Sequence, residues 1–186
     1  SFLNEGTLQA SNGGTLVLSG SGTGDFTNTG GTIQALDNSE VQFTTNASIT
    51  GGTLTTAGTG VIRANASQDV FLTELTNAGN FQADNNTDLG LSGTIHNTGS
   101  ITSTSTGSAT DIEIQAGGAT LTGGGTVTLV GATGVAGINA SPSGARLINT
   151  DNTIQGQGRI GQSTAAVTNQ AAGLIDANVN GQTLTL

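Results

Sequence analysis

The sequence predicts an all-β protein: a single-domain, right-handed parallel β-helix, or β-solenoid, of about eight coils. A short phrase recurs eight times along the 186 residues, and each repeat is too short to bury a core unless it stacks on its neighbours. Apolar and polar residues alternate over short stretches, as in strands with one buried face, and no helical stripe of useful length is present. The 31 glycines supply the backbone conformations that sharp corners between strands require.

The phrase begins as F-L-N-E-G-T-L-Q-A at residues 2–10 and returns as F-T-N-T-G-G-T-I-Q-A at 26–35 and L-T-N-A-G-N-F-Q-A at 75–83. Its first apolar residues are 20 to 26 positions apart, which sets the expected coil length. Because β-crossover-β connections of this kind are right-handed, we expect a right-handed coil. These first apolar residues form the first predicted column: Phe2, Phe26, Ile49, Leu75, Ile95, Leu121, Leu147 and Val167.

Two more apolar columns follow in each repeat, so each coil is expected to hold three short strands. Like columns should stack on one another as parallel sheets. All five phenylalanines lie in the first 81 residues, which predicts a wider core there. The second column is Leu8, Ile33, Leu54, Phe81, Ile101, Val127, Ile154 and Ile175, and the third is Leu16/Leu18, Val41/Phe43, Ile62, Leu89/Leu91, Ile112/Ile114, Val135, Ile160 and Leu184/Leu186.

Two stretches interrupt this rhythm, at residues 102–110 and 137–145. They are expected to emerge as loops on one side of the rod. Such loops carry recognition in some repeat proteins, but a slack polar turn is the favoured interpretation of both.

Charge and composition exclude several classes of function. The net charge is −9, with three arginines and no lysine, so neither nucleic acid nor an anionic membrane surface is an expected partner. The absence of cysteine removes disulfides and thiolate chemistry, and a single histidine makes a zinc site improbable. No apolar run is long enough for membrane insertion, and no cofactor is expected.

Asparagine occupies the same position of the phrase in six of the eight repeats. Such a column could present amide ligands to calcium or sugar. The favoured interpretation is structural, because stacked amides hydrogen-bond along the rod and satisfy turn backbone. Gly51 and Gly123 replace asparagine in two repeats, which a turn tolerates. The predicted asparagine ladder is Asn4, Asn28, Asn77, Asn97, Asn149 and Asn169.

The acidic residues form three close pairs in sequence: Asp37/Glu40, Asp84/Asp88 and Asp111/Glu113. Asp111 and Glu113 flank the inward Ile112, so both carboxylates should point outward, and they are the candidate calcium ligands. No calcium-loop motif accompanies them, so a solvated face is the favoured interpretation. With one histidine and three arginines available as partners for these acids, we expect the protein not to be an enzyme.

The phrase L-x-N-x-G-x-I-x-A, followed by G-G-x-L-x-L, resembles the repeats of large bacterial exoproteins, namely filamentous-haemagglutinin-like adhesins and autotransporter passengers. The resemblance covers nearly the whole chain. It implies a β-solenoid segment, residues 1–186, excised from a longer repetitive protein that is secreted or attached to the bacterial surface. It also implies a stiff rod for adhesion, aggregation or biofilm contact, with cell-surface glycans as partners.

Other copies of the chain are a further expected partner, because uncapped solenoid ends favour head-to-tail association. Two alternatives to the adhesive rod stay open. One is a glycan- or ice-binding module that uses a flat face of threonine, asparagine and glutamine. The other is a polysaccharide-active β-helix enzyme or a segment of a phage fibre.

Overall fold

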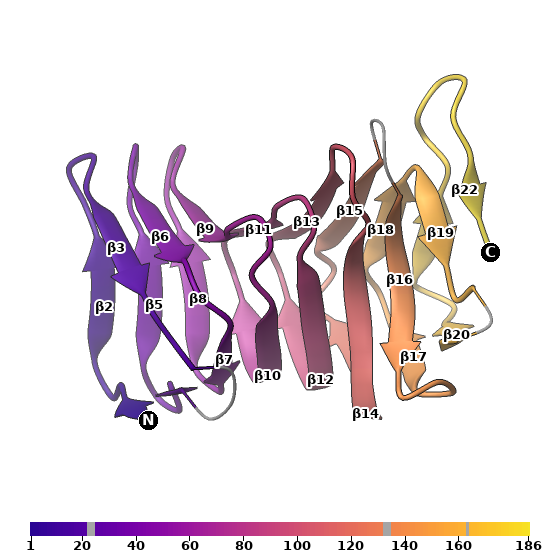
Figure 1. The fold of residues 1–186 in the computed structure, drawn as a ribbon. Coiled ribbons are helices and arrows are strands. Elements are labelled where there is room, and N and C mark those ends of the chain that lie inside the picture. The colour runs from indigo at the N-terminus through magenta and orange to yellow at the C-terminus, as the bar shows by residue number, and fades with distance from the viewer. Residues whose placement is uncertain (22–24, 132–134, 163) are drawn as a thin grey trace.

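The computed structural model describes residues 1–21, 25–131, 135–162 and 164–186. In these ranges the chain is all β, with no helical residue. Its strands pair in parallel and stack as a β-solenoid of about eight turns, with the N-terminus at one end and the C-terminus at the other (Figure 1). The predicted fold class is therefore confirmed.

Each coil contributes one strand, or part of a strand, to each of three faces. The first face contains β1 (Phe2–Leu3), β4 (Phe26–Thr27), β7 (Ala47–Thr50), the first parts of β10 (Val70–Asn77), β12 (Asp88–Asn97) and β14 (Thr110–Thr122), then β16 (Ala136–Ser141), β19 (Gly158–Ile160) and β22 (Leu184–Thr185). The second face contains β2 (Thr7–Ala10), β5 (Thr32–Ala35), β8 (Thr53–Thr56), the later parts of β10, β12 and β14, then β17 (Arg146–Asn149) and β20 (Ala166–Asn169). The third face contains β3 (Thr15–Leu18), β6 (Glu40–Phe43), β9 (Val61–Ala64), β11 (Asn80–Ala83), β13 (Ser100–Ser105), β15 (Thr126–Gly131), β18 (Thr153–Gly156) and β21 (Leu174–Asp176).

The predicted columns are wrong in one respect, because the phrase changes face between the third and fourth coils. Phe2 pairs with Phe26 and Phe26 with Ile49, but Ile49 pairs with Leu72 and not with Leu75. The first three phrases thus run from the first face to the second, and the later ones run from the second to the third. The physical reason is that Leu72 and its neighbours already fill the first face of the fourth coil, so the phrase that follows starts one corner later.

The core lies between the three faces and is built from alternating residues. Phe43 and Phe81 are among its largest fully buried side chains. Three of the five phenylalanines, Phe26, Phe43 and Phe81, are in the core, whereas Phe71 points outward on β10 and Phe2 is 49% exposed. Alternation decides this outcome, because Val70 and Leu72 occupy the inward positions beside Phe71.

The two expected loops are mostly strand. β13 continues to Ser105 and β14 begins at Thr110, so only a short turn separates them. Ser103 Oγ donates to the carbonyl of Thr110 at 2.7 Å, and Ser105 Oγ donates to that of Ser108 at 2.6 Å. β16 likewise occupies most of the second stretch. At the turn between β13 and β14, the serine hydroxyls donate hydrogen bonds to backbone carbonyls and hold the chain close to the rod.

Candidate functional site

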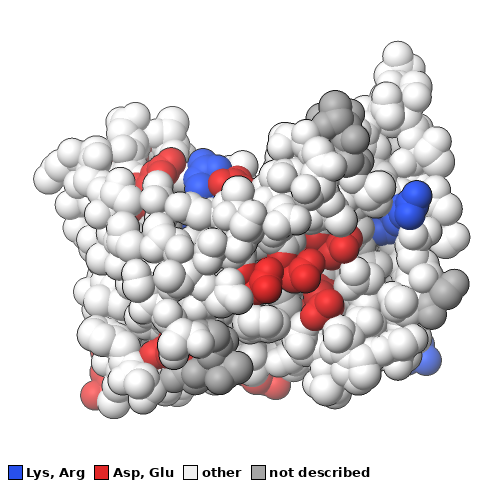
Figure 2. Space-filling model, viewed as in Figure 1, with Lys and Arg blue, Asp and Glu red and all other residues white. Residues whose placement is uncertain are grey.

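Three aspartates lie side by side on the first face, one on each of three consecutive coils. Asp88 pairs with Asp111 in the register of β12 and β14. Asp69 directly precedes Val70, which pairs with Leu89, and its carboxylate accepts a hydrogen bond from the backbone N–H of Asp88 at 3.0 Å. Glu113 follows two residues after Asp111 on β14. We call Asp69, Asp88, Asp111 and Glu113 the acidic ladder, and Figure 2 shows acidic side chains gathered over this part of the rod.

The ladder follows from local sequence and parallel pairing. Leu89 and Ile112 point into the core, so the residues beside them must point outward. Parallel, in-register strands then place equivalent side chains about 4.8 Å apart. Three carboxylates in one column therefore repel one another.

This repulsion and partial burial raise the pKa values of two ladder residues, Asp88 and Asp111. The pKa of Asp88 rises to about 6, mainly because burial penalises the charged form, and further because Asp69, Glu113 and Asp111 are negative. Burial and Glu113 also raise the pKa of Asp111, while a hydrogen bond from Asn139 and the charge of Arg159 act in the opposite direction.

The surroundings of the ladder add an aromatic ring and amides. Phe71 pairs with Gly90, which pairs with Glu113. A Cβ atom at Gly90 would overlap the Phe71 ring and approach Nε2 of Gln115, so glycine lets the ring lie across this face. Nε2 of Gln115 donates to Oε1 of Glu113 at 2.8 Å.

The predicted calcium ligands, Asp111 and Glu113, do lie on one strand with Ile112 buried between them. Within the described ranges, however, no group of three or more histidine, cysteine, aspartate or glutamate side chains is arranged to hold a metal ion. Two carboxylates alone fall short of the six to eight oxygen ligands that calcium takes.

The six predicted ladder asparagines lie at two corners of the solenoid. Asn4 and Asn28 lie between the first and second faces, where Nδ2 of Asn4 donates to Oδ1 of Asn28 at 2.6 Å. The other four lie between the second and third faces, because the phrase has changed face. There Asn77 donates to Asn97, and Asn149 to Asn169, each at 2.8 Å.

A seventh asparagine, Asn152, joins the second corner and was missed by the sequence reasoning. Nδ2 of Asn97 reaches across the intervening coil to Oδ1 of Asn152 at 2.8 Å. Gly125 leaves room for this contact, since a Cβ there would lie 2.5 Å from the Asn97 carbonyl oxygen and 2.7 Å from Nδ2. The available signal was that Asn152 stands before Thr153 where other coils have glycine. These amides are all engaged within the protein.

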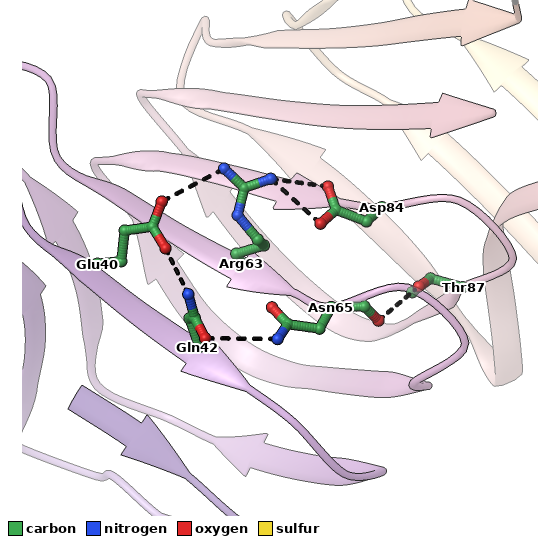
Figure 3. Close-up of polar contacts among 6 residues, drawn as sticks. All are labelled: Glu40, Gln42, Arg63, Asn65, Asp84 and Thr87. Atoms are coloured by element: carbon green, nitrogen blue, oxygen red, sulfur yellow. Dashed lines mark hydrogen bonds and ion pairs between the residues drawn. The ribbon is translucent and has the colours of Figure 1, made fainter. Parts of the chain in front are cut away.

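Two of the three acidic pairs read from the sequence, Asp37/Glu40 and Asp84/Asp88, are separated in the structure. Asp84 and Glu40 both contact Arg63, which lies between them on the third face (Figure 3). Nη1 of Arg63 lies 2.9 and 3.1 Å from the two oxygens of Asp84, and Nη2 lies 3.6 Å from Oε1 of Glu40. We call these three residues the Arg63 clasp. Asp37 instead accepts hydrogen bonds from Thr59, which lower the pKa of its carboxyl.

Threonines form an outward rank on the second face of the first four coils. The register links Thr7, Thr32, Thr53 and Thr76, and the next position holds His96. His96 contacts Thr122 through Nδ1 at 3.1 Å. On the trailing side of the rank, Gln34 donates to Gln9. The rank is thus short and bordered by long amide side chains.

None of the described residues lies in a helix long and apolar enough to cross a membrane. Comparison with known proteins gives no match to a family model, to a curated protein or to a solved structure.

Proposed function

We propose that this chain is a non-enzymatic structural and adhesive segment of a secreted or surface-attached bacterial exoprotein. It acts as a stiff rod that holds polar contact surfaces away from the cell. The observation that carries the proposal is parallel backbone pairing, which links each coil to the next on all three faces from β1–β3 to β19–β21. Repeat arrays of this kind resist bending and proteolysis, since every strand inside the rod is held by neighbours on both sides.

Two further features support the proposal. Seven asparagine side chains make hydrogen bonds to one another at the corners of the solenoid. These internal contacts favour a structural role for the repeated sequence phrase. The phrase itself resembles those of filamentous-haemagglutinin-like adhesins and autotransporter passengers. Under this proposal the partners are cell-surface glycans or further copies of the chain.

Adhesion and stiffness are tested together by attaching the chain to beads through either terminus. We expect the beads to adhere to glycan-coated or bacterial surfaces, and the folded chain to resist a broad-specificity protease at concentrations that digest a urea-unfolded sample. Beads that adhere no better than beads coated with the unfolded chain would refute the adhesive role. Release of reducing ends from any polysaccharide would instead establish an enzyme.

Glycan binding on the first face is a second candidate, favoured by the Phe71 ring across Gly90 beside Gln115 and Glu113. An aromatic surface bordered by amides and carboxylates offers sugars both an apolar contact and hydrogen bonds. A glycan array would test it: binding that is lost in Phe71→Ala and kept in the third-face control Val17→Ala supports this face. Equal binding by both variants would exclude it.

A further inference from the structure

We propose that the solenoid opens as two blocks that meet between the third and fourth coils, and that the Arg63 clasp holds them together. The N-terminal block comprises residues 1–64 and the C-terminal block residues 70–186. This inference concerns how the rod comes apart, and it does not depend on the proposed function.

The side-chain ladders change corner at this boundary. The Asn4–Asn28 ladder ends at the third coil, where the Nδ2 of Asn28 donates to the carbonyl of Gly51 at 3.3 Å. The second ladder starts only at Asn77, at a different corner. Neither chain of side-chain amide contacts runs from one block into the other.

Packing and pairing on the second face also change here. The apolar column of Leu8, Ile33 and Leu54 meets Asn77, because Leu54 pairs with that fully buried amide. β8 pairs with β5 over four residues but with β10 over only two. An amide stacked on a leucine replaces the apolar contact that continues the core elsewhere.

Local strain and an unmet polar group lie next to the boundary. Glu74 has a φ of 49°, in the left-handed region, where the β10–β12 register shifts between Thr73 and Leu75. The left-handed region is unfavourable for a residue other than glycine. Oδ1 of Asn65, at the end of the third coil, is buried and has no hydrogen-bond partner. The Asn65 oxygen lies at the joint itself, whereas the register shift at Glu74 falls between the fourth and fifth coils, and a similar unmet oxygen, Oδ1 of Asn139, lies within the C-terminal block. The division into blocks therefore rests on the change of corner and on the two-residue pairing of β8 with β10.

The Arg63 clasp spans this boundary from the outside. Arg63 belongs to the third coil and Asp84 to the fourth, and their contact uses both carboxylate oxygens. Glu40, on the second coil, holds the other side of the guanidinium. Thr87 Oγ1 adds a hydrogen bond to the Asn65 carbonyl at 3.2 Å (Figure 3). Both Asp84 contacts come from Nη1 of Arg63, and a hydrogen bond between charged groups is stronger than one between neutral groups.

Hydrogen exchange of the full 186-residue chain, followed by NMR at increasing urea below the global transition, tests the division. We expect core amides of residues 26–64 to converge on one exchange isotherm and those of residues 88–156 on another that lies at higher urea. A single isotherm for both sets would overturn the division into blocks.

Arg63→Gln tests the clasp in the same experiment. We expect it to move the N-terminal isotherm by about 0.5 M urea to lower concentration and to leave the C-terminal one in place. The matched control is Arg146→Gln, whose arginine donates to Thr168 on the exposed surface, and it should leave the N-terminal isotherm in place. An unchanged N-terminal isotherm in Arg63→Gln, or equal movement of both isotherms, would overturn the role of the clasp.

Discussion

Asp88→Asn should stabilise the protein at neutral pH and flatten the pH dependence of its stability. Asp88 faces Asp69, Asp111 and Glu113 on the first face, with Arg159 two coils beyond Asp111. Its pKa in the folded chain, about 6, lies above the ordinary aspartate value of 3.8. The folded state therefore holds this proton more tightly than the unfolded state, so the stabilisation is complete below about pH 4 and is lost as the pH rises to about 6.

The magnitude follows from the same two values. Without solvent screening, the difference corresponds to about 3 kcal/mol. Asp88 is only half-buried, and screening reduces this to about 1 kcal/mol. For a chain of this length, the midpoint of thermal unfolding should then be about 3 °C higher in Asp88→Asn than in the native protein at pH 7.5. The two should coincide near pH 4.

Thermal unfolding followed by circular dichroism from pH 4 to 8 measures this difference. Asp37 and Asp151 have lowered pKa values, so their contributions fade only below about pH 4 and do not overlap the interval above pH 4 in which the contribution of Asp88 changes. Glu5→Gln, which removes an exposed charge outside the ladder, is the control and should parallel the native protein. Parallel curves for native protein and Asp88→Asn over this interval would refute the reasoning.

Three further substitutions probe the corners and the core by urea unfolding. Gly125→Ala should cost at least about 2 kcal/mol, because its Cβ meets backbone atoms, whereas Gly107→Ala, in open space, should cost less than about 0.5 kcal/mol. Asn97→Ala should cost about 2 kcal/mol by leaving buried amides unpaired, and a neutral result would show that the ladder contributes little. Phe43→Ala should cost about 3 to 5 kcal/mol and the exposed Val17→Ala under about 0.5 kcal/mol; similar losses in both would contradict the assigned core.

The repeated phrase made it possible to predict the fold class from the sequence. The face of the solenoid that each phrase occupies could not be predicted in the same way. Asn4 and Asn77 belong to nearly the same phrase but lie at different corners. The phrase specifies one corner and the two strands that flank it, and a three-sided coil has more than one such corner. A signal was present in the unassigned pair Val70 and Leu72. Their alternation just before Leu75 indicates one more strand than the predicted column allows.

The acidic ladder was hidden by the same shift. Proximity in sequence joined Asp84 to Asp88, although a corner separates them and directs one to Arg63 and the other to the first face. Once Val70 is aligned with Leu89, Asp69 and Asp88 fall into one column with Asp111. Side-chain pairing across coils depends on register, and register depends on backbone contacts that no single phrase encodes.

Parallel stacking brings like side chains together, and its effect depends on whether a side chain can bond to its own kind. An amide both donates and accepts, so the contact between Asn77 and Asn97 is favourable. A carboxylate only accepts hydrogen bonds, so the contact between Asp88 and Asp111 is unfavourable unless a proton or an opposite charge lies between them. In the Arg63 clasp, an opposite charge lies between two carboxylates. Asp88→Asn would give the first face a donor that can bond to the neighbouring carboxylates, which is why removing a charge there should stabilise the rod while Asn97→Ala weakens it.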